Sequence, residues 1–299
     1  YACSIDCIFI YFKSILQVSY MVNNNIAILL STYNSEEYLS EQINSIISQT
    51  VKEWILYIRD DGSSDNTFAI ISNYCRLFDN IIHIKDNMNN LGAKKSFIKL
   101  LSEVESPYYM FCDHDDVWLP EKIEKTLHKM KEAESKNPLK PVLVFTDLIV
   151  VDRNLNIISN SMWEYQKTNP LHSKDVYTLS ISNPITGCTI MINRAAKDVS
   201  VPMSSKSLMH DLWIALNVSH YGYIDFVNEP TMLYRQHNRN VLGAKKVSFL
   251  YYFFRLQSIN KLFSDNFELY QMLRSLSFKV NLYKLIYYKL KIVLIKLFT

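Results

Sequence analysis

The sequence predicts an α/β protein in which a single doubly wound, mostly parallel sheet is flanked by helices and followed by a helical, basic C-terminal tail. Short apolar runs alternate with helix-type patterns over residues 26–135, which predicts the sheet. The hydrophobic content, 48% of the 299 residues, is too high for a disordered chain. The uneven distribution of lysine and arginine predicts the tail.

The first half of the chain contains four apolar runs, which predict buried strands at Ile26–Ser31, Trp54–Arg59, Ile81–Lys85 and Tyr108–Cys112. A helix is predicted after each strand. We expect Ser35 and Asp65 to cap the first and second helices. The third helix runs from about Ala93 to Val104, and Pro120 is expected at the first position of the fourth. Strands joined by helices run parallel, which gives the doubly wound arrangement.

The second half of the chain is less regular. We expect one helix at His210–Val218 and five strands, at Val142–Thr146, Ile149–Val151, Cys188–Asn193, Tyr223–Val227 and Thr231–Gln236. Because neither a repeat nor a low-complexity linker interrupts the pattern, we interpret it as one domain with a helical tail.

Several classes of protein are disfavoured by the composition. The five cysteines fit neither a disulfide framework nor a zinc site, which favours a reduced, cytoplasmic protein. The five glycines lie too far apart for a dinucleotide fingerprint or a phosphate-binding P-loop, so other groups must hold any nucleotide. Residues 1–20 are apolar and contain no methionine, and we interpret them as a non-native or upstream extension before a start at Met21.

The C-terminal segment is strongly basic. Residues 245–299 carry ten lysines and arginines against two acidic residues, a net charge of +8, which leaves −5 for the rest of a chain whose total is +3. The segment is also rich in tyrosine, leucine and isoleucine, which predicts a basic amphipathic helix on an anionic membrane surface. The alternative is a helix that packs on its own domain with solvated lysines. Binding to nucleic acid is disfavoured, because the positive charge is confined to the tail.

Polar clusters follow three of the predicted strands, at Ser31–Asn34, Asp60–Ser63 and Asp113–Asp116. In an open parallel sheet, ligands bind beyond the carboxyl ends of the strands, so these clusters are expected to share one crevice. Several carboxylates in such a crevice repel one another unless a cation lies among them. Mg²⁺ or Mn²⁺ suits oxygen ligands and bridges carboxylates to phosphates. A nucleoside diphosphate with one of these ions is therefore predicted.

Eight sequence segments between Ile26 and Gly243 resemble the family 2 glycosyltransferases of the GT-A fold. The similarity is greatest to the bacterial branch that adds rhamnose or related sugars to surface polysaccharides. The segments are SxYN at Ser31–Asn34, SQT at Ser48–Thr50, IRDDGSSDNT at Ile58–Thr67, NLGAKKSF at Asn90–Phe97, FCDHDDVWLPEKI at Phe111–Ile123, TGCTIMINR at Thr186–Arg194, HDLW at His210–Trp213 and YRQHNRN at Tyr234–Asn240.

The resemblance implies a nucleotide site made of four residues. Ser31 and Tyr33 should lie against the base, with Tyr33 able to stack on it. Asp61 should accept a hydrogen bond from the base N3–H, a donor that uracil and thymine share. Asp113 should contact the ribose.

The resemblance also implies a site for Mg²⁺ or Mn²⁺. Asp115 should ligate the metal that bridges the diphosphate, with Asp113 beside it. His237 matches a histidine that lies near the diphosphate or completes the metal shell in relatives, although a hydrogen-bonded loop histidine is the simpler alternative. Arg235 and Arg239 could screen the charge of the diphosphate, but an arginine in a loop is more often solvated.

Asp211 is the candidate general base. It stands at the start of a predicted helix, where it can take the proton from an acceptor hydroxyl that attacks the anomeric carbon. One base and one metal are enough for a single displacement with inversion, whereas a hydrolase would need a second carboxylic acid. The alternative is an acid that only stabilises the N-terminus of its helix.

The sequence therefore predicts an inverting, metal-dependent glycosyltransferase at the cytoplasmic face of a bacterial membrane. We expect residues 21–245 to form the catalytic domain, with a nucleotide-binding half at about 26–135, an acceptor half at about 136–245, and the tail at 246–299. The expected partners are a nucleotide-sugar donor, a lipid-linked oligosaccharide acceptor and the membrane surface. dTDP-L-rhamnose is the expected donor, with a UDP-hexose such as UDP-galactose or UDP-glucose as the alternative. A nucleotidyltransferase and a non-catalytic glycan-binding or scaffold protein are the competing classes.

Overall fold

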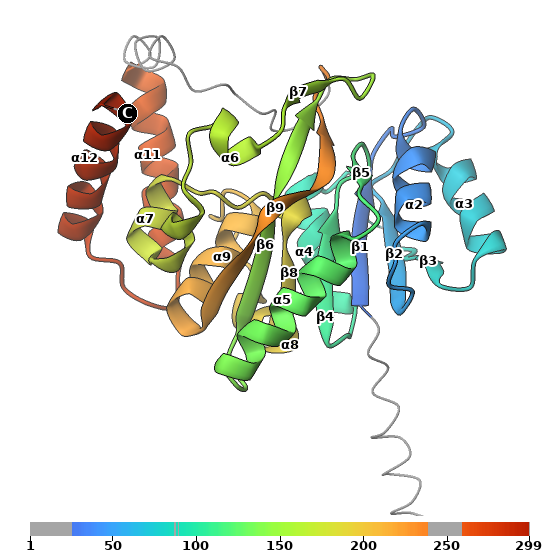
Figure 1. The fold of residues 1–299 in the computed structure, drawn as a ribbon, viewed down its shortest axis with the longest axis horizontal. Coiled ribbons are helices and arrows are strands. Elements are labelled where there is room, and N and C mark those ends of the chain that lie inside the picture. Colours follow the sequence, from blue (N-terminus) through green and yellow to red (C-terminus); the bar gives the residue numbers. More distant parts are fainter. Residues whose placement is uncertain (1–25, 87, 89, 239–258, 299) are drawn as a thin grey trace, which may run out of the picture.

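The computed structural model describes residues 26–86, 88, 90–238 and 259–298, so the predicted extension at 1–20 lies outside the described residues (Figure 1). The strands are β1 (Ile26–Thr32), β2 (Trp54–Asp60), β3 (Ile81–His83), β4 (Tyr108–Cys112), β5 (Val117–Trp118), β6 (Val142–Val151), β7 (Ile157–Ser159), β8 (Met191–Asn193) and β9 (Tyr223–Arg235). The α-helices are α2 (Leu39–Ile47), α3 (Thr67–Leu77), α4 (Ala93–Glu103), α5 (Lys122–Lys136), α6 (Met162–Tyr165), α7 (Val176–Ile181), α8 (Arg194–Ser200), α9 (His210–Tyr221), α11 (Ile259–Arg274) and α12 (Leu282–Phe298). Two 3₁₀ helices are η1 (Pro170–Lys174) and η2 (Gly187–Thr189).

One sheet organises the described residues. Its strands pair in the order β3-β2-β1-β4-β8-β6-β9-β5, and β7 pairs with β6. The strands β3, β2, β1 and β4 run parallel, as predicted. β8 is antiparallel to both β4 and β6, whereas β6 and β9 are parallel to each other. The sheet with helices on both faces confirms the predicted fold class.

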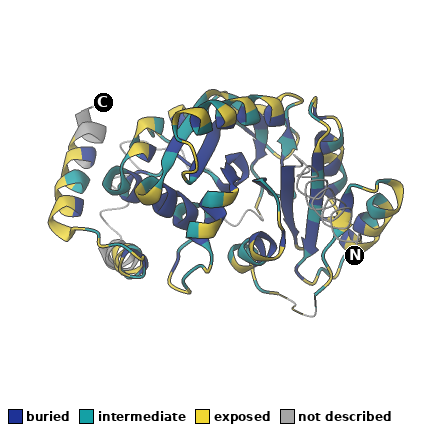
Figure 2. Ribbon diagram, turned by 90° about the horizontal axis from the view of Figure 1, so that it is seen from below, coloured by how far each residue is buried: buried dark blue, intermediate teal, exposed yellow. Residues whose placement is uncertain are grey.

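Side chains of β1 alternate between two hydrophobic cores, one on each face of the sheet. Ile26, Ile28 and Leu30 pack with residues of α2, α3 and α5 on one face. Ala27 and Leu29 pack with residues of α4, α8 and α9 on the other. Figure 2 shows the buried strands enclosed between these helical layers. Because both faces are covered, the ends of the strands are the places left for a ligand.

Two pairs of predicted strands are in fact single strands. β6 continues through Asp147 and Leu148, and β9 continues through Glu229 and Pro230. The register between β6 and β9 shifts on both sides of Asp147. The polar residues that break the apolar pattern therefore mark an irregular pairing rather than a turn between strands.

Two of the predicted helix starts are wrong. The Ser35 hydroxyl accepts from the Tyr33 backbone N–H, and a turn separates Ser35 from α2. Pro120 lies two residues before α5, whose N-cap is Glu121, and the Pro120 carbonyl accepts from the Thr50 backbone N–H. The Asp65 carboxylate does accept the backbone N–H of Thr67, the first residue of α3.

The described part of the tail, residues 259–298, contains α11 and α12 and packs on the domain. α11 and α12 lie at the opposite end of the molecule from α2 and α3 (Figure 1). Met272 and Leu273 of α11 and Leu285 of α12 are buried in the core that includes α9. Tyr288 of α12 stacks on Tyr177 of α7, with ring centroids 5.7 Å apart. Among the described helices, none is long and apolar enough to cross a bilayer.

Candidate active site

Asp61 lies directly after β2, at the carboxyl edge of the parallel strands. Its side chain is buried, and its backbone N–H donates to the carbonyl of Thr32 at the end of β1 (2.8 Å). The carboxylate accepts three hydrogen bonds: from the Arg59 guanidinium (2.6 Å), from the Leu91 backbone N–H (2.8 Å) and from the Gly92 backbone N–H (2.7 Å). These donors fix its orientation.

The other two predicted base-contacting residues lie at the end of β1 and just beyond it. Ser31 is buried, and its hydroxyl donates to Ser96 of α4 at 2.7 Å. Tyr33 is 45% exposed, so its ring is accessible to a planar ligand. Because β1 ends at Thr32, Ser31 is still within the strand and Tyr33 directly follows it.

Three aspartates follow β4, the neighbour of β1. Asp113 is half-buried, whereas Asp115 and Asp116 are buried. Burial raises the pKa of Asp113, and the negative charges of Asp115 and then Asp211 add to the effect. Burial also raises the pKa of Asp116 well above its usual range, with Asp115 and Asp113 as further causes. For Asp115, burial also acts to raise the pKa, but the hydrogen bond to His237 and nearby positive charge outweigh it, and the pKa is lowered.

The cluster has the donor set of a hard divalent cation. Side-chain atoms of Asp113, Asp116 and Cys188 lie within 4.8 Å of one another. One carboxylate oxygen of Asp116, Oδ2, is buried, and the Cys188 thiol donates to the Asp116 carboxylate. Burial raises the pKa of the Cys188 thiol well above its usual range, so the sulfur is a poor metal ligand and the oxygens remain. Oxygen ligands fit Mg²⁺ or Mn²⁺.

His237 lies in the segment after β9, next to the aspartates that follow β4. Its Nε2 lies 2.8 Å from Oδ2 of Asp115, and both side chains are about nine-tenths buried. Its ring lies 5.1 Å from that of Tyr38. The structure therefore brings His237 to Asp115, although the two are 122 residues apart.

Arg235 is not the solvated loop residue that the sequence suggests. It is 3% exposed, and its guanidinium lies over the Tyr38 ring at 4.5 Å. Its side chain donates to the carbonyls of Asp115 (2.8 Å) and Arg153 (2.7 Å) and pairs with Glu41. It therefore holds in place the backbone of the segment Asp113–Asp116, through the carbonyl of Asp115. Arg239 lies outside the described residues.

Asp211 stands in the first turn of α9, where its carboxylate is half-buried. Its negative charge is one of the causes that raise the pKa of Asp113, after burial and the charge of Asp115. Gly187 lies against this turn. A Cβ on Gly187 would lie 3.0 Å from His210 Nε2 and 3.6 Å from Asp211 Cβ, so glycine lets the two segments meet.

Sequence reasoning missed several residues that shape the site: Arg59, Ser96, Gly187 and the buried role of Arg235. Only Arg59 could have been found from the sequence, because it directly precedes the Asp60-Asp61 pair. The others are recognisable only once residues distant in the sequence are side by side.

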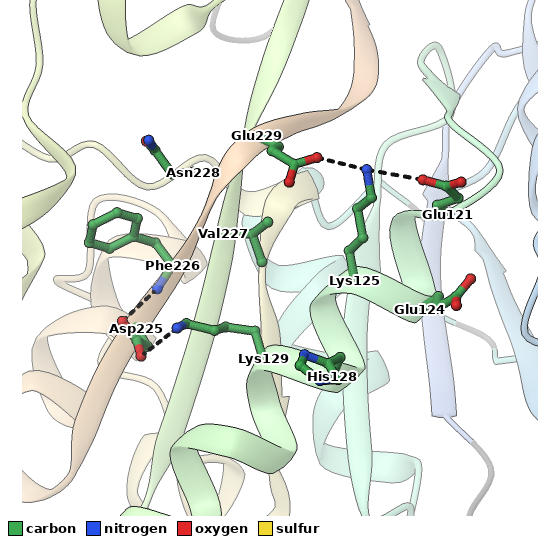
Figure 3. Close-up of a pocket in the computed structure, with 10 residues that line it drawn as sticks. All are labelled: Glu121, Glu124, Lys125, His128, Lys129, Asp225, Phe226, Val227, Asn228 and Glu229. Atoms are coloured by element: carbon green, nitrogen blue, oxygen red, sulfur yellow. Dashed lines mark hydrogen bonds and ion pairs between the residues drawn. The ribbon is translucent and has the colours of Figure 1, made fainter.

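A separate surface hollow lies between α5 and the first half of β9 (Figure 3). It contains none of the predicted site residues. Lys125 pairs with Glu121 and Glu229, and Lys129 pairs with Asp225. Because both of its lysines are held in ion pairs and none of the predicted site residues lines it, we assign it no catalytic role.

Comparison with known proteins decides the family. The family model described as "Glycosyl transferase family 2" matches residues 27–199, more than half of the chain. The chain belongs to glycosyl transferase family 2. It is therefore an enzyme, and the resemblance inferred from the eight segments is confirmed.

Two curated relatives extend over most of this family 2 glycosyltransferase. The dTDP-rhamnosyl transferase RfbG of Shigella flexneri is 29% identical over 245 residues, which cover 72% of this chain and 74% of RfbG. The putative teichuronic acid biosynthesis glycosyltransferase TuaG of Bacillus subtilis (strain 168) is 26% identical over 235 residues, covering 76% of this chain and 86% of TuaG.

Solved structures share the fold of this family 2 glycosyltransferase. S. aureus TarS 1–349 in complex with UDP-GlcNAc superposes with a TM-score of 0.54 and 21% identity, covering 75% of this chain and 62% of that one. The mannosyltransferase PcManGT from Pyrobaculum calidifontis, in complex with GDP-Man and Mn²⁺, has a TM-score of 0.51 and 10% identity, covering 72% and 58%. The chain thus spans about three fifths of the length of these solved proteins.

Proposed function

We propose that this glycosyltransferase moves a sugar from a nucleoside-diphosphate donor to a growing, lipid-linked surface polysaccharide, with inversion at the anomeric carbon. One observation carries the proposal: Asp61 follows β2, Asp113 and Asp115 follow β4, these two strands flank β1 in the parallel part of the sheet, and the charge of Asp211 acts on Asp113. In the same proposal, residues 21–245 are the catalytic domain, with the nucleotide in the half at about 26–135 and the acceptor in the half at about 136–245.

The nucleotide is proposed to lie along the ends of β1, β2 and β4. Asp61 accepts the N3–H of uracil or thymine, and the exposed ring of Tyr33 stacks on the base beside Ser31. Asp113 accepts from the ribose hydroxyls. The three hydrogen bonds that the Asp61 carboxylate accepts support its role, because they fix its orientation beyond the end of β2.

Asp115 and Asp113 are proposed to hold Mg²⁺ or Mn²⁺, with His237 next to Asp115. When bound, such an ion stabilises negative charge on the leaving diphosphate. The close approach of several buried carboxylates supports a cation at this cluster, because Asp113, Asp115 and Asp116 repel one another when ionised.

Asp211 is proposed as the general base. It takes the proton of the acceptor hydroxyl while that oxygen attacks the anomeric carbon and the bond from this carbon to the diphosphate oxygen breaks. The products are the glycosylated acceptor, the nucleoside diphosphate and a protonated Asp211, which returns its proton to water. A single displacement of this kind inverts the anomeric configuration.

The proposed donor is dTDP-L-rhamnose, and a UDP-hexose is the alternative. The similarity to a dTDP-rhamnosyl transferase supports rhamnose. The test is nucleotide release from dTDP-rhamnose, UDP-galactose, UDP-glucose and UDP-GlcNAc, with Mn²⁺ and with EDTA. We expect slow release from one donor that EDTA abolishes. Release that is unaffected by EDTA would contradict a metal-dependent mechanism.

The lipid-linked acceptor and a position at the cytoplasmic face of the membrane are supported by the outer face of α12. Its exposed apolar side chains recur at helical spacing, opposite the buried Leu285 and Ile292. Lys284 and Lys291 are exposed beside them. A row of tyrosine and leucine bordered by lysine suits an anionic lipid surface. The row consists of Tyr283, Ile286, Tyr287, Leu290 and Leu294.

Replacing Leu290 with glutamate is expected to lower binding to vesicles of phosphatidylglycerol and phosphatidylcholine by about tenfold. The change removes one apolar side chain that is proposed to enter the lipid and adds a negative charge that the anionic lipid repels. Co-sedimentation measures the binding. The matched control is Leu139→Glu, at a leucine that is 99% exposed in the turn after α5. Equal binding of the two variants would remove α12 from the proposed membrane contact.

A further inference from the structure

Arg59 is a buried arginine with an unusual number of partners beneath the proposed base site. It is the next-to-last residue of β2, and its side chain is 1% exposed. One guanidinium nitrogen, Nη1, donates both to Asp61 (2.6 Å) and to the Ser96 hydroxyl (3.0 Å). Nε and Nη2 donate to the two oxygens of Asp86, at 2.8 and 3.3 Å. Nη2 also donates to the carbonyl of Met88.

These contacts tie three segments together under the ends of the strands: the end of β2, the stretch from Asp86 to Gly92, and the first turn of α4. Ser96 joins the network to β1, because its hydroxyl accepts from Ser31. A planar guanidinium can reach all of these partners at once, whereas a lysine ammonium offers one point of contact. Arg59 therefore sets where this stretch and the Asp61 carboxylate lie relative to the sheet.

The Asp61 carboxylate has almost no unused acceptor capacity. Its Oδ1 accepts from Arg59 and from the Leu91 backbone, and its Oδ2 accepts from the Gly92 backbone. An ionised carboxylate offers about four acceptor positions, so one remains, on Oδ2. Rotation of the carboxylate would break all three existing bonds. A ligand therefore meets a single acceptor that points in one fixed direction.

We propose that Arg59 is a positioning residue that aims this one acceptor of Asp61 at the N3–H of a uracil or thymine base, and thereby sets pyrimidine selectivity without touching the nucleotide. The inference rests on the proposed nucleotide site. Cytosine presents an acceptor at N3, so a fixed carboxylate oxygen repels it. If Arg59 no longer holds Asp61, the carboxylate can turn, and discrimination between uracil and cytosine is lost.

The test is titration calorimetry of UDP and CDP with Mn²⁺ present. In Arg59→Lys, we expect UDP to bind about tenfold more weakly, while CDP binding changes less than twofold, so that selectivity falls. Thermal unfolding of each variant is measured alongside. The matched control is Lys99→Ala, because Lys99 is the other cation beside Asp86 (3.7 Å) and is not one of the three donors to Asp61. It should leave the UDP affinity unchanged.

A double-mutant cycle separates positioning from general stabilisation. In an Asp61→Asn background, Arg59→Lys should cause no further loss of UDP affinity. Equal losses for UDP and CDP in Arg59→Lys, or losses that add in the double variant, would overturn the inference while leaving the nucleotide site intact. An Asp61→Asn variant with wild-type UDP affinity would instead overturn the proposed base contact, and the inference with it.

Discussion

The Asp211→Asn variant is expected to turn over about 10²–10⁴-fold more slowly than the wild type while binding UDP or dTDP with nearly unchanged affinity. The amide keeps the size of the side chain but cannot accept the proton of the acceptor hydroxyl. Asp211 lies in the first turn of α9, apart from the Asp61 network that is proposed to hold the base. Steady-state kinetics with the cognate donor and calorimetry with the nucleotide give the two readouts.

A matched control separates catalysis from helix stabilisation. Asp175 caps α7, where its carboxylate accepts from the backbone N–H groups of Tyr177 and Thr178. The Asp175→Asn variant is expected to lose some stability and to keep its turnover. If Asp211→Asn behaved like Asp175→Asn, Asp211 would be only a favourable charge at a helix N-terminus.

The second large effect is expected at Asp115. We expect Asp115→Asn to lower turnover by about 10²–10³-fold and to remove the strengthening of nucleotide binding by Mn²⁺, since it weakens the site that stabilises charge on the diphosphate. The substitution also leaves His237 without its carboxylate partner at 2.8 Å. Comparing nucleotide affinity with Mn²⁺ and with EDTA in both proteins measures the change.

The half-buried Asp152 supplies the control for this substitution. Its carboxylate accepts from Asn154 and Asn156 in a turn between β6 and β7, and we place it outside the site. The Asp152→Asn variant should retain the full effect of Mn²⁺. A strong Mn²⁺ effect that persists in Asp115→Asn would show that other residues hold the ion.

The sequence was sufficient to predict the parallel half of the sheet and the three polar clusters at its edge. Buried parallel strands are continuous apolar runs, so β1, β2 and β4 are recognisable locally. Strands joined by helices place their carboxyl ends at one edge, and this brings Asp61 and Asp113 to one side of the sheet without knowledge of tertiary contacts.

Other features depend on contacts between distant residues and could not be predicted. Arginine in a loop is usually solvated, yet Arg235 is buried because the carbonyls of Asp115 and Arg153 and the ring of Tyr38 converge on it. The tail sequence has two apolar faces, and a periodic pattern alone does not say which face meets the domain. The structure assigns Leu285 to the inner face of α12.

The central claim is that the acid cluster at the strand ends binds a nucleoside diphosphate together with a divalent cation. Titration calorimetry of the wild-type chain with UDP and with dTDP, in Mn²⁺ and then in EDTA, tests it most directly. We expect binding of at least one nucleotide to be at least about tenfold tighter with Mn²⁺. Binding of neither nucleotide, or equal affinity with Mn²⁺ and with EDTA, would contradict the claim.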